Sequence, residues 1–178
     1  MPHPLVRTLA LLLLPVLAAC TGSTSAPIFR PSIVTTSTIH TPTLSEGQQA
    51  ANDVVVRFRR LVDVLRSQDM PDSSQLAAVA RDSAYEKWTQ VLQDDFVNGY
   101  HQTGWAVMTI QSIDPGISSR QWLVSGCLDV TNLDIVDKAG TTTLAHPGGI
   151  NHVIYGVDQD ERTLRWYVTS ETFDGVPC

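Results

Sequence analysis

Residues 83–113, SAYEKWTQVLQDDFVNGYHQTGWAVMTIQSI, contain the change of pattern that decides the fold. From about Ser83 to Asn98 the apolar side chains recur at helical spacing, and Gly99 follows, a residue suited to a left-handed helix C-cap. From Gly104 onward the apolar residues recur at every second position, which is typical of half-buried strands. The chain therefore predicts helices first and an antiparallel sheet afterwards.

An amphipathic helix is expected from about Ser45 to Ser67, ahead of the quoted stretch. Ser45 with Gln48, or Thr43 with Glu46, can cap its N-terminus. Its apolar stripe is made of Ala51, Val54, Val55, Phe58, Leu61, Val62 and Leu65. The densest basic group of the chain lies between these apolar positions and is interpreted as a solvated helix face: Arg57, Arg59 and Arg60.

The second half of the chain predicts antiparallel strands joined by polar turns, over residues 105–113, 120–136, 151–158 and 163–170. Asn132 and Asp134 interrupt the long second segment, which indicates a bulge or a bend that curves the sheet. Residues 141–150 are a loop or a weak edge strand. Together with a short helix that starts at Asp72 or Ser73, the pattern predicts an α+β fold. Its N-terminal helices pack in the concave face of a curved, four- to five-stranded antiparallel sheet.

Alternation along each strand also predicts which side chains face the helices. The candidate ligand pocket among these inward residues consists of Met108, Trp122, Tyr155 and Trp166. The predicted interior contains no carboxylate and no histidine, so a proton-transfer enzyme would lack its base, and Asp129 enters only if its strand is bulged. No metal site is expected either, because the histidines lack ligand spacing: His101, His146 and His152.

Three segments carry a family resemblance: GYHQTGW (99–105), GCLDVT (126–131) followed by VDKAG (136–140), and LRWYV (164–168) through Pro177-Cys178. With helices ahead of a curved antiparallel sheet, the chain resembles the nuclear transport factor 2-like superfamily. It looks more closely like a group of actinobacterial and actinophage lipoproteins. The resemblance covers roughly residues 45 to 178. Because that superfamily includes enzymes, subunits and binding proteins, the resemblance implies a fold and leaves the function open.

The N-terminus predicts a lipid anchor. Leu17-Ala18-Ala19-Cys20 resembles a bacterial lipobox, and it follows Arg7 and an apolar run that is too short to span a membrane. The resemblance implies that residues 1–19 are a lipoprotein signal peptide and that Cys20 becomes the acylated mature N-terminus. Residues 20–43 are then a Ser/Thr/Pro-rich tether, and 44–178 form the globular domain.

The two remaining cysteines, Cys127 and Cys178, form an even pair in a compartment where disulfides persist, and we expect them to bond. The formal net charge of −6 and the lack of a basic cluster argue against nucleic acid as a partner.

The expected function is that of a non-catalytic lipoprotein on the outer side of the bacterial cytoplasmic membrane. It needs no cofactor, and it binds a small apolar ligand or an envelope partner. One alternative is a phage-borne protein-interaction module that excludes a second phage at the envelope. An isomerase- or dehydratase-like enzyme is the other, and it requires an Asp, Glu or His side chain in the interior.

Overall fold

The computed structural model of the protein describes residues 43–143 and 149–178, except for the side chain of Pro177. The predicted signal peptide, the lipidation site Cys20, nearly all of the predicted tether and His146 lie outside these residues.

Helix α1 spans Glu46–Arg66 and begins with the predicted Ser45–Gln48 capping box. The Gln48 backbone N–H donates to Ser45 Oγ at 3.3 Å, and the Ser45 backbone N–H donates to Gln48 Oε1 at 3.0 Å. Two backbone donors at the start of the helix are satisfied in this way. The apolar stripe is fully buried at Ala51, Val54, Val55, Phe58, Val62 and Leu65.

Two more helical segments follow. The short 3-10 helix η1 spans Ser73–Ala78, and its cap Asp72 accepts a hydrogen bond from the Ser74 backbone N–H. Helix α2 spans Asp82–Asn98 and ends at Gly99, whose φ of 70° lies in the left-handed region. The predicted C-cap is therefore present, since glycine adopts this conformation without a Cβ clash.

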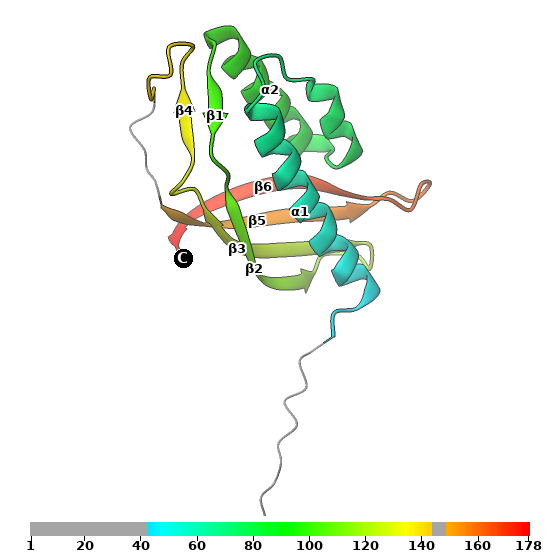
Figure 1. Ribbon diagram of the computed structural model, residues 1–178. Helices are drawn as coiled ribbons and strands as arrows, with labels where there is room; N and C mark the ends of the chain where they lie inside the picture. The colour runs from blue at the N-terminus through cyan, green and yellow to red at the C-terminus, as the bar shows by residue number, and fades with distance from the viewer. Residues whose placement is uncertain (1–42, 144–148) are drawn as a thin grey trace, which may run out of the picture. The chain divides into compact units, whose positions relative to one another are not determined.

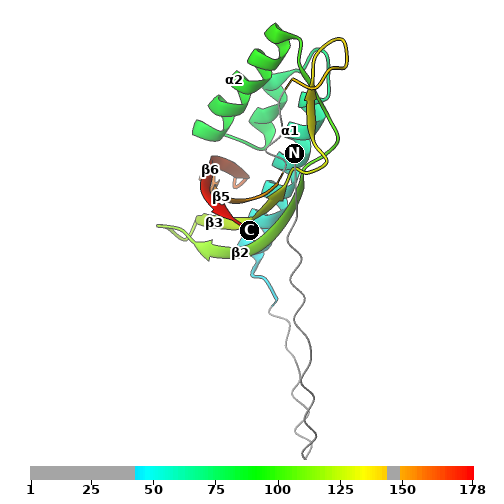
Figure 2. The same cartoon turned by 90° about the vertical axis from the view of Figure 1, so that its left-hand side faces the viewer.

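Four antiparallel strands form the main sheet in the order β2-β3-β5-β6. They are β2 (Val107–Pro115), β3 (Gln121–Asp129), β5 (Ile150–Gln159) and β6 (Trp166–Pro177). Helices α1 and α2 lie on the same side of this sheet, and α1 crosses its strands (Figures 1 and 2). The predicted α+β architecture is confirmed.

A second, two-stranded sheet pairs β1 (His101–Thr103) with β4 (Asp134–Val136), and the two strands run side by side in Figure 1. The single strand expected over residues 120–136 is therefore wrong. The strand ends at Asp129, a turn at Thr131 and Asn132 follows, and the chain then joins the second sheet. The predicted interruption is real, but it moves the chain from one sheet to another instead of curving one strand.

The predicted inward faces of the strands are confirmed. Val124, Leu128, Val153, Tyr155, Val157 and Val168 belong to the buried core, and Ala106, Met108, Ile110, Trp122, Val130 and Trp166 pack against it. Alternation with Trp166 and Val168 predicts that Leu164 shares their inward face, but Leu164 lies in the turn before β6 with a φ of 58° and its side chain is exposed.

Strand β6 differs most from its prediction, which ended at Ser170. It continues to Pro177 and contains a bulge: Val157 pairs with Val168, and the preceding Gly156 pairs with Ser170. Thr169 is therefore an extra residue. Because successive side chains of a strand point to opposite faces, one extra residue turns every later side chain to the other face. Glu171 thereby comes to lie beside Tyr155, on the inward face.

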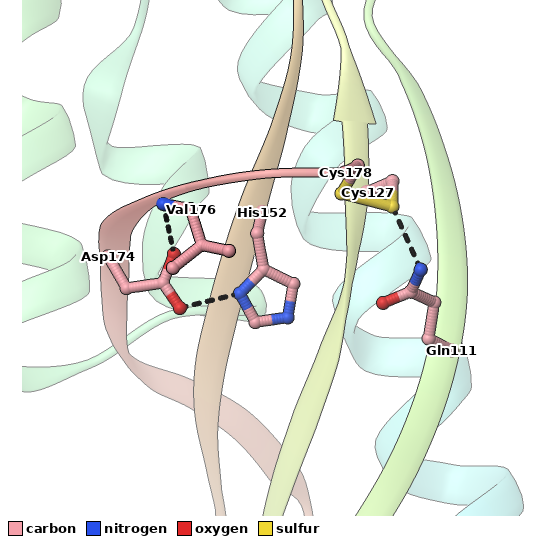
Figure 3. Close-up of a disulfide and its surroundings, with 6 residues drawn as sticks. All are labelled: Gln111, Cys127, His152, Asp174, Val176 and Cys178. Carbon is pink, nitrogen blue, oxygen red and sulfur yellow. Dashed lines mark hydrogen bonds and ion pairs between the residues drawn. A yellow bond between two sulfur atoms is a disulfide. The ribbon is translucent and has the colours of Figure 1, made fainter.

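The last residue of the chain is bonded to the outer face of the sheet. Cys178 forms the predicted disulfide with Cys127 of β3, and their Cα atoms lie 5.9 Å apart, within the usual range. Figure 3 shows the terminal segment passing over β5, where His152 Nδ1 lies 2.7 Å from Asp174 Oδ2. Asp174 also accepts from the Val176 backbone N–H, and these two interactions lower the pKa of its carboxyl.

Candidate functional site

A buried carboxylate, Glu171, lies at the centre of the polar interior, and its side chain has no exposed surface. Oε1 accepts from Arg59 Nη1 at 3.1 Å and from the Tyr155 hydroxyl at 3.2 Å. Oε2 accepts from Lys87 Nζ and from Trp88 Nε1, both at 2.8 Å. Four donors from α1, α2 and β5 thus hold one carboxylate of β6.

The polar contacts continue from Glu171 along α1 to the far end of α2. Arg59 Nη2 lies 3.6 Å from Asp63 Oδ1, and Asp63 accepts from Gln102 Nε2 at 3.0 Å. Arg66 donates to Gln102 Oε1 at 3.4 Å and to Asp95 Oδ2 at 2.8 Å. We call these six residues the buried polar network: Arg59, Asp63, Arg66, Asp95, Gln102 and Glu171.

The phenol beside Glu171 is held neutral. Tyr155 is fully buried and packs edge-on against Phe58, with their ring centroids 6.1 Å apart. Burial is the main cause that raises the Tyr155 pKa well above its usual value. The phenol therefore acts as a hydrogen-bond donor to the carboxylate.

A cavity of about 320 Å³ adjoins this network. One part of its wall comes from the helices and carries Arg59, Arg66, Lys87 and Trp88. The remainder comes from the strands and the segment between them: Leu128, Val130, Leu133, Ile135, Asn151 and Phe173. The volume is at the lower end of the range for small-molecule sites, and a mainly apolar wall with a few polar groups is typical of them.

Trp88 is the centre of the helical part of the wall. The Arg59 guanidinium carbon lies 5.1 Å from the centroid of its ring, and the Arg66 guanidinium carbon and Lys87 Nζ each lie 5.8 Å from it. Lys87 Nζ also lies 5.0 Å from the ring centroid of Phe173. Three cations therefore surround one aromatic ring at cation–π distances.

The four residues predicted to line a single pocket lie apart. Met108 borders a hollow of about 210 Å³ near Trp105, and Trp166 borders one of about 540 Å³ beside the outer face of α1. Trp122 is covered by the first turn of α1, where a side chain at Gly47 would meet its indole at 3.1 Å. Tyr155 is buried in the core, where the side chains of α1 fill the space expected for a ligand.

Two further expectations about the interior are wrong. The interior does contain carboxylates, Glu171 and Asp63, and Arg59 is 5% exposed instead of solvated. The sequence carried a signal for Arg59, because it follows Val55 by four positions and precedes Val62 by three, which places it on the buried face of the helix. For Glu171 the only hint was Gly156, since a glycine inside a strand often marks a bulge.

The other candidate residues have structural roles. Asp129 accepts hydrogen bonds from the backbone and the hydroxyl of Thr131 at the end of β3, and these bonds lower its pKa. His152 pairs with Asp174. Among the described residues, no group of His, Cys, Asp and Glu side chains is arranged to hold a metal ion. In the same part of the chain, no helix is long and apolar enough to cross a membrane.

The chain folds like the intermembrane space region of the chloroplast protein ARC6. That likeness has a TM-score of 0.59 and 14% identity, and it covers 76% of this chain and 100% of that one. An NTF-2-like protein of unknown function from Shewanella oneidensis matches 68% of this chain and 97% of its own, with a TM-score of 0.41 and 12% identity. No protein-family model and no curated protein matches the sequence. At these identities the first likeness shows a shared fold alone.

Proposed function

We propose that this chain is a non-catalytic binding protein, anchored by lipid on the outer side of the bacterial cytoplasmic membrane, whose globular domain holds a small apolar ligand. The observation that supports this proposal most strongly is the cavity beside Trp88, which has an apolar surface formed by Leu128, Val130, Leu133, Ile135 and Phe173. A lipobox-like segment ending at Cys20 and a disulfide at Cys178 both fit an envelope protein. We also propose that the chain is related to the nuclear transport factor 2-like superfamily and to bacterial lipoproteins.

Binding is favoured over catalysis because Glu171, the interior carboxylate that pairs with two cations of the cavity wall, already accepts four hydrogen bonds. A general base must reach the proton that it removes. Each oxygen of Glu171 accepts two hydrogen bonds, from Arg59 and Tyr155 on one side and from Lys87 and Trp88 on the other. A carboxylate held by four donors has no acceptor site left for a substrate proton. Glu171 accordingly fixes the position of the cavity wall.

Native mass spectrometry of the protein released from its own membrane tests whether the cavity holds a ligand. We expect a bound small molecule on the wild type. Leu133→Trp, which fills the cavity from its half-buried wall, should lose it, and Ile117→Trp, at a fully exposed loop position, should keep it. A wild type that always emerges free of ligand, or equal occupancy in Leu133→Trp, contradicts the proposal.

The anchor is tested separately with labelled palmitate. Cys20→Ala should abolish labelling and leave the precursor unprocessed, because the acyl acceptor is removed. Cys178→Ser should remain labelled, since its thiol belongs to the disulfide. Labelled Cys20→Ala protein of mature size would rule out the lipobox interpretation.

A further inference from the structure

The charges around the cavity are arranged with the cations toward it. Its wall contains Arg59, Arg66 and Lys87 and no carboxylate. The carboxylates that pair with these cations are Glu171, Asp63 and Asp95, and none of them is a wall residue. Because a charge entering the cavity is nearer to the cations than to their partners, the wall attracts an anion although each cation is already paired.

Two of the cations have donors to spare. A lysine ammonium has three N–H donors, and among the described residues Lys87 gives one of them to Glu171. An arginine guanidinium has five, and Arg66 gives two to Asp95 and Gln102. The Lys87 side chain is 40% exposed, so it reaches an incoming group without breaking the core. These donors suit a carboxylate or phosphate, which binds cationic donors more strongly than a neutral group does.

The strand side of the same cavity is apolar. Leu128 and Val130 continue the inward face of β3, Leu133 and Ile135 follow in the chain, and Phe173 comes from β6 beyond the bulge. A neutral apolar molecule would leave the cations without a partner from the ligand, and a small hydrophilic anion would leave the apolar wall uncovered. A ligand with an acidic head and a hydrocarbon body satisfies both sides.

We propose that the cavity binds a small amphiphile with one acidic headgroup, a carboxylate or a phosphate. Its head lies against Lys87 and Arg66 beside Trp88, and its hydrocarbon body lies among Leu128, Val130, Leu133, Ile135 and Phe173. This inference rests on the proposed ligand-binding function and narrows the small apolar ligand proposed there to one whose apolar body carries an acidic head.

The test uses the full chain in its own membrane and two photoreactive probes, decanoate and decanol that carry the same diazirine. Peptide mapping locates the labelled residues, and unlabelled decanoate, decyl phosphate and decanol compete. We expect labelling within residues 128–135 or next to Trp88 or Phe173. At least one acid should compete about 10-fold better than decanol, the ratio that a single charge-assisted hydrogen bond supplies. The stronger acid identifies the headgroup.

Variants test whether the cavity wall causes the preference for acids over decanol. Lys87→Gln should bring the acids and the alcohol to within about 3-fold of each other, whereas Arg162→Gln, in an exposed turn, should keep the preference. Val130→Asp leaves the Lys87–Glu171 pair in place and should weaken the acids more than decanol. Equal competition by acid and alcohol at the cavity peptides overturns the acidic-headgroup inference and leaves the ligand site standing. A failure of both probes to label these peptides overturns both.

Discussion

Glu171 is the residue on which the stability of the buried polar network depends most. One of its four donors is the buried guanidinium of Arg59. Among the described residues, Arg59 has one other carboxylate partner, Asp63. Removing one member of such a group leaves a buried charge without compensation, which is far more destabilising than the group as a whole is stabilising. Glu171 therefore acts first on stability and through it on the shape of the cavity.

Glu171→Gln is expected to lower the free energy of unfolding by about 3–5 kcal/mol, because Arg59 loses its nearest counter-charge. Urea denaturation followed by circular dichroism measures the change. The matched control is Glu161→Gln, which removes a carboxylate that is 82% exposed and paired with Arg120 at the surface. The control should unfold at nearly the wild-type urea concentration. A similarly small effect at Glu171 would show that the buried polar network does not stabilise the fold.

Burial of Tyr155 makes the stability of the fold depend on pH, and it also determines the direction of that dependence. Its pKa in the folded protein is raised, whereas in the unfolded chain the phenol ionises near pH 10. The unfolded state therefore releases this proton first, and stability is lost as the pH rises above about 10. The urea midpoint should fall more steeply between pH 9 and 11 in the wild type than in Tyr155→Phe. Parallel pH curves for the two proteins would contradict this account.

At the scale of elements, the bulge in β6 decides what the interior contains. Thr169 is the extra residue between the pairs Val157–Val168 and Gly156–Ser170. Its deletion should remove the bulge and keep Glu171 opposite Tyr155, because Val168 and Glu171 then lie two positions apart and face the same side by regular alternation. The expected results are a stability loss smaller than that of Glu171→Gln and slow hydrogen exchange at the Trp88 indole, which keeps its acceptor Glu171. Deleting Ser119, in the exposed loop between β2 and β3, is the control. Fast exchange of the indole in the Thr169 deletion would show that Thr169 is not the extra residue that sets the register.

Local signals in the sequence were sufficient for most elements. Ser45 and Gln48 marked the start of α1, Gly99 marked the end of α2, and alternation placed Tyr155 in the core. The buried site was not predictable in the same way. Glu171 faces inward only because one residue is added upstream in β6, and a strict period of two gives the opposite orientation.

The small β1–β4 sheet was missed for a related reason. Each of its strands has three residues, too few to show a period, and the two are far apart in the sequence. The cavity could not be predicted either, since its wall joins side chains from both helices with residues of β3, β4, β5 and β6 and of the segment between β3 and β4.

For the whole molecule, the disulfide fixes the C-terminus. The bond joins residues 51 positions apart and holds the end of β6 across β5 (Figure 3). Cys178→Ser should lower the free energy of unfolding by at most about 4 kcal/mol, the value that chain entropy gives for a loop of this length. Because the two cysteines act as one unit, Cys127→Ser/Cys178→Ser should lose no more than the single variant. A stability loss in the double variant close to twice that of the single one would contradict this coupling.

Stability of the tail matters for the cavity, because the wall residue Phe173 precedes Asp174 in β6, and Cys178 directly follows that strand. The Asp174 pKa is lowered in the folded state, so the stabilisation that this carboxylate provides is present above its ordinary pKa and is lost as the pH falls through the lowered value. The tail is therefore held by the disulfide across the whole pH range and by Asp174 only where its carboxyl is ionised.

A crystal structure of the protein purified from its own membrane would show directly whether the cavity beside Trp88 is a ligand site. We expect electron density for an organic molecule that touches Phe173 and the apolar wall, with its polar end against Lys87 or Arg66. A cavity that holds only ordered water, or one closed by side chains of its own wall, would contradict this expectation.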